Sequence, residues 1–100
     1  IKPQDLKSNL SSVTLIDVRR KADLETDTSK LPGAAWYDPE QIETWATQLP
    51  KDKEVVLYCV RGGSVSNSVL DNLRSKNIDA RFIEGGIVAW KEAGGEVVVK

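Results

Sequence analysis

The stretch EVVLYCVRGGSVSNSVLDNLRS, residues 54–75, contains a predicted strand, a loop and a predicted helix in direct succession. Residues 54–58 form a compact run of β-branched and apolar side chains, which is typical of a buried strand. Beyond the loop, apolar residues recur at every fourth position, which predicts an amphipathic helix over residues 64–75. Cys59, the only cysteine of the chain, lies between the two. The stretch therefore predicts a strand–loop–helix unit with a thiol at the end of the strand.

The rest of the chain continues this alternation of strands and helices. The other predicted strands are residues 13–18, 79–84 and 96–100, with a short one after the Pro-Gly turn in 31–37. The other predicted helices are residues 2–10, 38–49 and 87–94, and residues 19–30 are a charged connection with one helical turn. This order favours one α/β domain over residues 1–100, a mostly parallel five-stranded sheet with helices on both faces. In such folds ligands bind beyond the carboxyl ends of strands, where Asp17, Arg19 and Cys59 are expected.

Composition excludes several kinds of site. The chain has 100 residues and no histidine, so a Ser-His-Asp triad, a Cys-His dyad and the usual Cys/His zinc sites are impossible. We expect no metal and no cofactor. The formal net charge of −1 gives no basic surface for nucleic acid. No apolar run approaches the ~18 residues of a membrane span, so we expect no membrane partner.

Cysteine usage and the missing methionine bear on location. One cysteine cannot form an internal disulfide, which leaves the redox compartment open. Since the sequence lacks methionine, we expect its original start, with any targeting signal, to lie outside these residues. We expect a cytoplasmic protein, with the periplasm as the alternative, and a monomer or a weak dimer.

The loop after Cys59 has the residues of an anion-binding turn. A thiolate is the nucleophilic form of cysteine, and the pKa of a thiol falls at a helix amino terminus. Two consecutive glycines allow the loop amides to turn inward as a nest, to which the helix dipole adds. Arg61 can reach an anionic substrate, and Ser64 or Ser66 can donate a hydroxyl hydrogen bond. On this pattern alone, an inert buried thiol stays open as a second interpretation. The predicted binding loop comprises Val60, Arg61, Gly62, Gly63, Ser64 and Val65.

Four segments resemble the motifs of single-domain rhodaneses. YCVRGGS, residues 58–64, is similar to the active-site loop of that family, and LIDVR, residues 15–19, to its Asp-Val-Arg strand end. LPGA, residues 31–34, resembles its His-Ile-Pro-Gly-Ala segment, and FIEGGIVAW, residues 82–90, resembles its closing Gly-Gly and Trp motif. The segments follow the order and spacing of the family over nearly the whole chain. The resemblance implies a rhodanese-like three-layer fold and a thiosulfate sulfurtransferase-like activity.

The resemblance also implies a mechanism and residue roles. The Cys59 thiolate attacks the outer sulfur of a donor such as thiosulfate, sulfite leaves, and the persulfide passes its sulfur to cyanide or a thiol. The implied partners are a small sulfur donor and an acceptor that is a small molecule or a protein thiol. Asp17 and Arg19 are interpreted as an ion pair that braces the loop behind Cys59, with a catalytic role as the alternative. Val60 and Ser64 stand where many members have arginine or threonine, which leaves the donor open.

Two other functions compete with the enzyme. One is a non-catalytic rhodanese-like module that docks a partner or senses oxidants through Cys59. The other is a phosphatase or arsenate reductase, whose loop needs an arginine at the sixth position after the cysteine to clamp an oxyanion. That position holds Val65, which argues against the second alternative.

Two further pairs of residues are expected near the site. Gly85 and Gly86 are expected to form a tight turn whose backbone approaches the pocket. Arg20 and Lys21 are interpreted as solvated charges, or alternatively as additions to a positive rim around that pocket.

Overall fold

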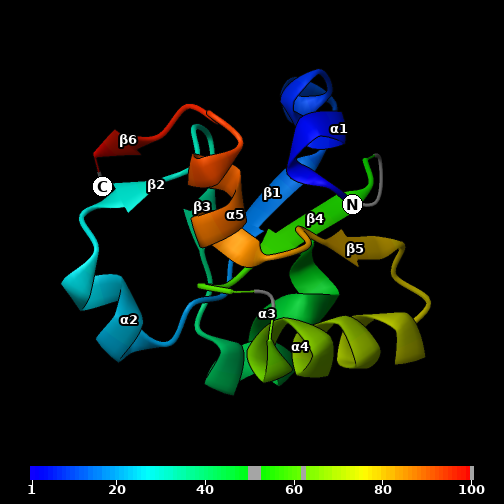
Figure 1. Ribbon diagram of the computed structural model, residues 1–100. Helices are drawn as coiled ribbons and strands as arrows, with labels where there is room; N and C mark the ends of the chain where they lie inside the picture. Colours follow the sequence, from blue (N-terminus) through cyan, green and yellow to red (C-terminus); the bar gives the residue numbers. More distant parts are fainter. Residues whose placement is uncertain (50–52, 62, 100) are drawn as a thin grey trace.

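The computed structural model describes residues 1–49, 53–61 and 63–99, and a parallel sheet lies at its centre (Figure 1). The sheet has four parallel strands in the order β3 (Ala35–Trp36), β1 (Thr14–Asp17), β4 (Val55–Tyr58) and β5 (Ala80–Phe82). Asp17 of β1 lies opposite Tyr58 of β4, so the carboxyl ends of the two central strands are neighbours. Cys59 follows directly after β4. The predictions that fall on Pro50, Gly62 and Lys100 lie outside the described residues.

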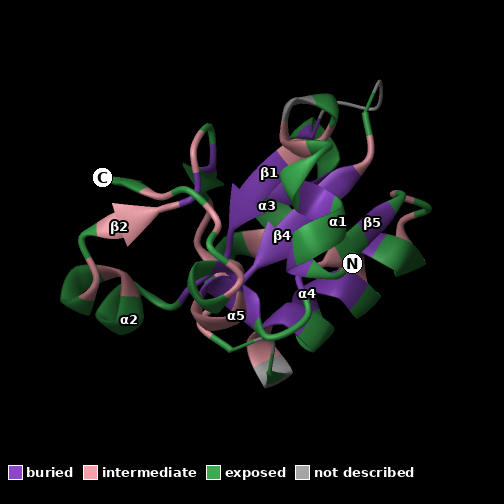
Figure 2. Cartoon of the chain, turned by 45° about the horizontal axis from the view of Figure 1, so that its top comes forward, coloured by how far each residue is buried: buried purple, intermediate pink, exposed green. Residues whose placement is uncertain are grey.

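Helices cover both faces of this sheet. The described helices are α1 (Pro3–Lys7), α2 (Lys21–Thr26), α3 (Ile42–Trp45), α4 (Ser64–Ser75) and α5 (Gly86–Glu92), with 3₁₀ turns at Leu10–Ser12, Pro39–Gln41 and Ala46–Gln48. Because side chains alternate along a strand, β4 sends Val55 and Leu57 into one apolar cluster and Val56 and Tyr58 into the other. α3 and α4 close the first cluster, and α1 and α5 close the second (Figure 1). Figure 2 shows the buried residues running along the strands between these helices, which confirms the predicted three layers.

The predicted count of five strands is wrong, because the main sheet has four. The segment predicted as a strand over residues 96–100 forms β6 (Val98–Val99), which pairs antiparallel with β2 (Ser29–Lys30) in a separate two-stranded sheet. Trp90 explains the difference, since its indole Nε1 donates to the Glu96 carbonyl at 2.8 Å. The chain after α5 is thereby held against that helix and meets β2 rather than an edge of the main sheet.

The predicted helices agree with the observed helices to different degrees. α4 has the predicted bounds and is followed by Asn77, whose φ of 60° lies in the left-handed region. The predicted helix over residues 38–49 is instead a succession of 3₁₀, α and 3₁₀ turns. At its start the Asp38 side chain accepts from the Glu40 amide. The helix predicted over residues 2–10 ends early. Side chains of the two residues after α1 donate to the Asp5 carbonyl and compete with helical bonding. Over the described ranges, no helix has the length and apolar character needed to span a bilayer.

Candidate functional site

Cys59 lies at the carboxyl end of β4, in the middle of the sheet. The amide of Val18, just beyond β1, donates to the Tyr58 carbonyl at 2.9 Å and extends the pairing of the two strands to this point. The thiol is free of any disulfide, the residue is 6% exposed, and it packs in the apolar cluster that α3 and α4 close. The strand therefore delivers the sulfur to the edge of the core on the α4 side of the sheet.

The first turn of α5 fixes the backbone after Cys59. The amides of Ile87 and Val88 donate to the carbonyls of Cys59 and Val60 at 3.0 and 3.1 Å. Gly86 permits this contact: a Cβ atom at that position would lie 2.5 Å from both carbonyl oxygens, and its φ of 62° already favours glycine. The sequence prediction that Gly85 and Gly86 form a turn with backbone close to the site is confirmed, with α5 acting as a clamp on the loop.

This clamp also determines where the loop amides point. The described peptide bonds are all trans, and in a planar trans peptide the carbonyl and the following N–H point in opposite directions. Because the Cys59 and Val60 carbonyls face α5, the amides of Val60 and Arg61 face away from it, on the side of the sheet that α4 covers (Figure 1). Two successive amides with one direction form the beginning of a nest for negative charge. α4, which starts five residues after Cys59, adds its amino-terminal dipole.

The remaining residues of the predicted loop have varied surroundings. Val60 and Val65 are half-buried, while Arg61 and Gly63 are exposed; Gly62 and the side chain of Ser64 lie outside the part of the chain that is described. Ser66 is fully buried, and its hydroxyl has no hydrogen-bond partner among the described residues. Sequence reasoning missed Asn67, whose backbone amide and side-chain amide both donate to the Gly63 carbonyl at 3.2 Å. An asparagine in the first turn of a helix is the signal that could have identified this contact.

Asp17 and Arg19 form a buried ion pair behind the loop. Arg19 Nη2 lies 2.7 Å from Asp17 Oδ2, and Arg19 Nε donates to both carboxylate oxygens at 3.1 and 3.0 Å. Arg19 is 1% exposed and Asp17 is 2% exposed. The Tyr58 hydroxyl donates to Asp17 Oδ2 at 3.1 Å, so the pair is bonded to the residue that precedes Cys59. The predicted ion pair is present, and its contacts are those of a brace.

The brace extends to other parts of the chain. Arg19 Nη1 lies 3.2 Å from Asp27, and Arg19 Nη2 donates to the Ser29 carbonyl at 2.9 Å. Asp27 in turn pairs with Lys91 of α5 at 3.0 Å. We call the residues of this brace the support cluster: Asp17, Arg19, Asp27 and Tyr58. It connects β1, β4, β2 and, through Lys91, the helix that clamps the loop.

Three members of the support cluster, Arg19, Tyr58 and Asp27, have shifted pKa values. Burial alone would lower the pKa of Arg19, but its bonds to Asp17 and the nearby negative charges outweigh burial and raise it. Burial, with the charge of Asp17, raises the pKa of Tyr58 well above its ordinary value, so its hydroxyl remains a donor. Burial would raise the pKa of Asp27, yet hydrogen bonds from Ser29 and Lys91 prevail and hold it well below its ordinary value.

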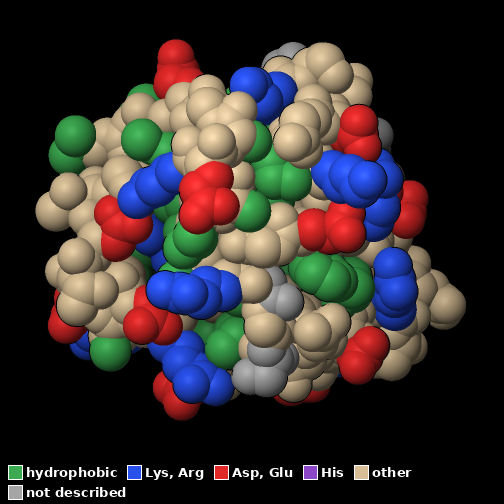
Figure 3. All heavy atoms as spheres, viewed as in Figure 1, with side chains coloured by type: hydrophobic (Ala, Val, Ile, Leu, Met, Phe, Trp, Pro, Cys, Tyr) green, Lys and Arg blue, Asp and Glu red, His purple; other side chains and the backbone are tan. Residues whose placement is uncertain are grey.

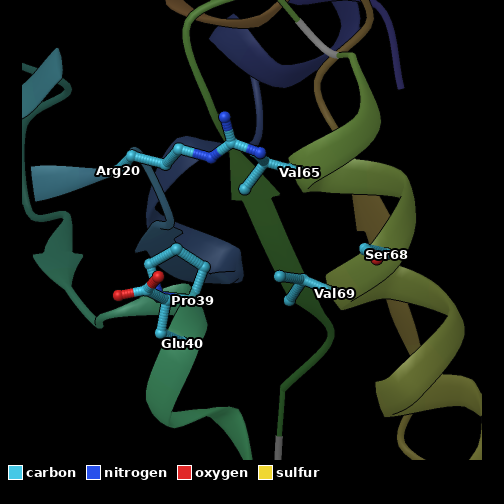
Figure 4. A pocket seen from close by; sticks show the side chains of 6 residues that line it. All are labelled: Arg20, Pro39, Glu40, Val65, Ser68 and Val69. Atoms are coloured by element: carbon cyan, nitrogen blue, oxygen red, sulfur yellow. The ribbon is translucent and has the colours of Figure 1, made fainter. Parts of the chain in front are cut away.

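A pocket of about 410 Å³ opens next to the loop (Figure 4). It lies between the segment after β1, the 3₁₀ turn Pro39–Gln41 and the first half of α4. Its lining residues are Arg20, Pro39, Glu40, Val65, Ser68 and Val69. Among the described residues that were predicted for the site, Val65 and the rim candidate Arg20 line this pocket. Within the described ranges, no three His, Cys, Asp or Glu side chains gather as ligands for a metal ion.

The fold and the site define an α/β protein with a thiol at a strand end, under a loop that leads into a helix. Residues 2–93 match the rhodanese-like domain, and the chain belongs to this family. It is 28% identical to a sulfurtransferase of Allochromatium vinosum, over 91% of this chain and 83% of that protein. The crystal structure of a rhodanese-related protein from Thermoplasma volcanium superposes with a TM-score of 0.88 at 25% identity, covering 100% of this chain and 97% of the other. The resemblance read from the sequence is thus confirmed, and so is the rhodanese-like fold.

Several relatives are much longer than this chain, which covers 14–45% of their length. The probable adenylyltransferase/sulfurtransferase MoeZ of Mycobacterium tuberculosis is 33% identical over 90% of this chain. The chain spans 24% of the length of that protein. Both MoeZ and the Allochromatium vinosum protein carry the word sulfurtransferase in their names.

Proposed function

We propose that the chain moves a sulfane sulfur from a donor such as thiosulfate to cyanide or a thiol through a persulfide on Cys59. One observation carries the proposal: the only cysteine lies at the end of the central strand, beside loop amides that α5 turns toward the α4 side. A thiolate and a persulfide both carry negative charge on sulfur, and the same amides and helix dipole stabilise each.

The reaction consists of two displacements at sulfur. The Cys59 thiolate attacks the outer sulfur of thiosulfate, a sulfur–sulfur bond forms, and the bond to the sulfite sulfur breaks with its electron pair leaving on sulfite. The acceptor then attacks the outer sulfur of the persulfide, and the Cys59 thiolate leaves. The enzyme returns to its starting state, which is covalent, ping-pong catalysis. A thiol ionises in part at neutral pH, so these two displacements need no histidine as a base, and the chain has none.

The surroundings of the loop fit small charged reactants. Arg61 is exposed and offers a cation to an anionic donor. Figure 3 shows acidic and basic side chains interspersed over one face of the molecule, in keeping with the net charge of −1. Because the charges of the molecule nearly cancel, the cations near the loop attract a small anionic reactant only at short range.

Intact mass tests the proposal directly. Incubation with thiosulfate should add one sulfur atom to the protein, and cyanide or dithiothreitol should remove it. Cys59→Ser should gain no sulfur, whereas Ser75→Ala, at the end of α4, should gain it as the parent does. If parent and Cys59→Ser are equally inactive with thiosulfate, mercaptopyruvate and persulfide donors, the proposal fails.

The alternative is a binding or redox-sensing module of the same fold. The burial of Cys59 favours it, since a cysteine residue that is 6% exposed offers limited access to a donor. Such a module would show no sulfur transfer with any donor, while Cys59 would still react with hydrogen peroxide. Hydrolysis of an aryl phosphate would instead favour the phosphatase, against the valine at position 65.

A further inference from the structure

The pocket beside the loop, which we call the Arg20 pocket, has two charged walls and an apolar floor. Figure 4 shows Arg20 reaching over it from the segment after β1, with Pro39 and Glu40 on the opposite side. Val65 and Val69 of α4 point into the space between them. Its volume of about 410 Å³ lies in the range of small-molecule sites.

The Arg20 pocket lies at the same end and on the same face of the sheet as Cys59. Val65 belongs both to the predicted binding loop and to the pocket lining. Val65 and Val69 pack in the same apolar cluster as Cys59. Figure 4 shows the carboxyl end of β4 behind Val65 and the tip of Arg20. A ligand in this pocket is therefore next to the loop that carries the thiol.

The two charges of the pocket are available to a ligand. Arg20 and Glu40 are exposed, and neither takes part in any ion pair of the described residues. Arg19, one residue earlier, has its guanidinium bonded to two carboxylates and a carbonyl. One free cation and one free anion across an apolar floor complement a molecule with both charges and a short apolar stem.

We infer that the Arg20 pocket binds the sulfur acceptor, and that this acceptor is a thiol of the α-amino-acid class, of which free cysteine is the smallest. The α-carboxylate lies at Arg20, the α-ammonium at Glu40, and the thiol is directed to Cys59. This inference rests on the proposed function and names the substrate class of its second step. Ser68, at the pocket edge, supplies a hydroxyl for the carboxylate or the ammonium.

The transfer step balances without any further reactant. The acceptor thiol gives its proton to water, and its sulfur attacks the outer sulfur of the Cys59 persulfide. A bond forms between these two sulfurs, and the bond to the Cys59 sulfur breaks with the electron pair staying on Cys59. The product is the persulfide of the acceptor. The acceptor sulfur is oxidised and the Cys59 sulfur is reduced to the same extent, so the step needs no outside oxidant or reductant.

Four thiols and two variants test this assignment. The protein is loaded with thiosulfate, freed of donor, and mixed with acceptor; loss of the extra sulfur is followed by intact mass in quenched samples. The acceptors are cysteine, cysteamine without the carboxylate, 3-mercaptopropionate without the ammonium, and 2-mercaptoethanol without either. Each thiol is compared between parent and variant, so that its intrinsic reactivity cancels.

Each variant should affect only the thiols that carry its partner group. Arg20→Gln should slow cysteine and 3-mercaptopropionate about fivefold, the effect of a partly exposed charge pair. It should leave cysteamine and 2-mercaptoethanol unchanged. Glu40→Gln should slow cysteine and cysteamine alone. Lys21→Gln, an exposed cation outside the pocket lining, should change none of the four.

The outcomes distinguish failure of the acceptor assignment from failure of the proposed function. If no sulfur loads onto Cys59, the proposed function fails. If sulfur loads but each variant affects all four thiols alike, or none of them, the acceptor assignment is overturned while the function stands. An equal effect of Lys21→Gln would show that net charge alone acts, which also overturns it.

Discussion

Arg19 and Arg20 are consecutive residues that belong to two contrasting regions around Cys59. Arg19 is 1% exposed and has its donors bonded to Asp17, Asp27 and the Ser29 carbonyl. Arg20 is exposed in the wall of the Arg20 pocket and enters no ion pair of the described residues. The same side chain chemistry thus holds the backbone in one region and faces a ligand in the other. Bonding state, more than position in the sequence, separates a supporting arginine from one that can recognise a substrate.

Loss of the buried Arg19 guanidinium should have the largest effect on stability. Arg19→Met should lower the free energy of unfolding by about 3–5 kcal/mol, because it leaves the buried Asp17 carboxylate uncompensated. Urea unfolding measures the loss, and loading of sulfur onto Cys59 measures how far the loop depends on the brace.

An exposed pair of the same geometry is the matched control. Arg81 pairs with Glu54 through two bonds of 2.8 and 2.7 Å, and its side chain is 47% exposed. Arg81→Met should lower the free energy of unfolding by at most about 1 kcal/mol. Equal losses of unfolding free energy for the two variants would show that the burial of Arg19 contributes nothing to stability. Arg19 would then not differ from an exposed arginine.

The clamp of α5 on the loop can be broken at Gly86. Gly86→Ala should lower the free energy of unfolding by about 2–4 kcal/mol, as a strained backbone adds to overlap with two carbonyl oxygens. It should also slow sulfur loading, because the Val60 and Arg61 amides turn with those carbonyls.

Gly33 separates strain from overlap. Its φ of 79° is also left-handed, but a Cβ atom there would meet nothing within 4 Å. Gly33→Ala should therefore cost about 1 kcal/mol and leave sulfur loading unchanged. If Gly86→Ala behaves in the same way, the clamp does not position the loop.

Local patterns predicted the parts of the fold that depend on neighbouring residues. The bounds of α4, the strand before Cys59 and the Gly85–Gly86 turn follow from apolar spacing and glycine chemistry within a few positions. The separate sheet of β2 and β6 did not, because it depends on Trp90 holding a carbonyl six residues further on. A strand pattern indicates an extended segment and does not say which partner it finds.

The candidate site shows the same limit. The thiol, its loop and the Asp17–Arg19 pair could be read from motifs of a few residues. The donation from α5 to the loop joins residues 59 and 87, and the contact of Tyr58 with Asp17 joins two strands. Arg20 and Glu40 both line the Arg20 pocket, and no motif of the sequence joins the two residues. These contacts arise from the packing of the layers, which no short pattern encodes.

Tyr58 links the support cluster to Cys59 and offers a smaller test. Tyr58→Phe removes the hydroxyl that donates to Asp17 and accepts from the Leu31 amide at 3.3 Å. The free energy of unfolding should fall by about 1–2 kcal/mol, since two buried groups lose a partner. Tyr37→Phe, which keeps its ring against Trp45, should change it by less than about 0.5 kcal/mol. A loss for Tyr37→Phe as large as for Tyr58→Phe would remove Tyr58 from the support cluster.

Asp27 lies at the outer edge of the support cluster, where its side chain is 30% exposed, and should give the smallest effect. Hydrogen bonds from Ser29 and Lys91 hold its pKa below the ordinary 3.8. Because the folded pKa is depressed, the stabilisation is present above pH 3.8 and is lost as the pH falls through the folded value. The difference in free energy of unfolding between the parent protein and Asp27→Asn should stay below about 1 kcal/mol near neutral pH. It should shrink in urea titrations at pH values below 3.8. Asp23→Asn is the control substitution, at a residue that is exposed on α2 and in no ion pair of the described residues. A pH-independent difference for Asp27→Asn would mean that Asp27 contributes through packing instead of charge.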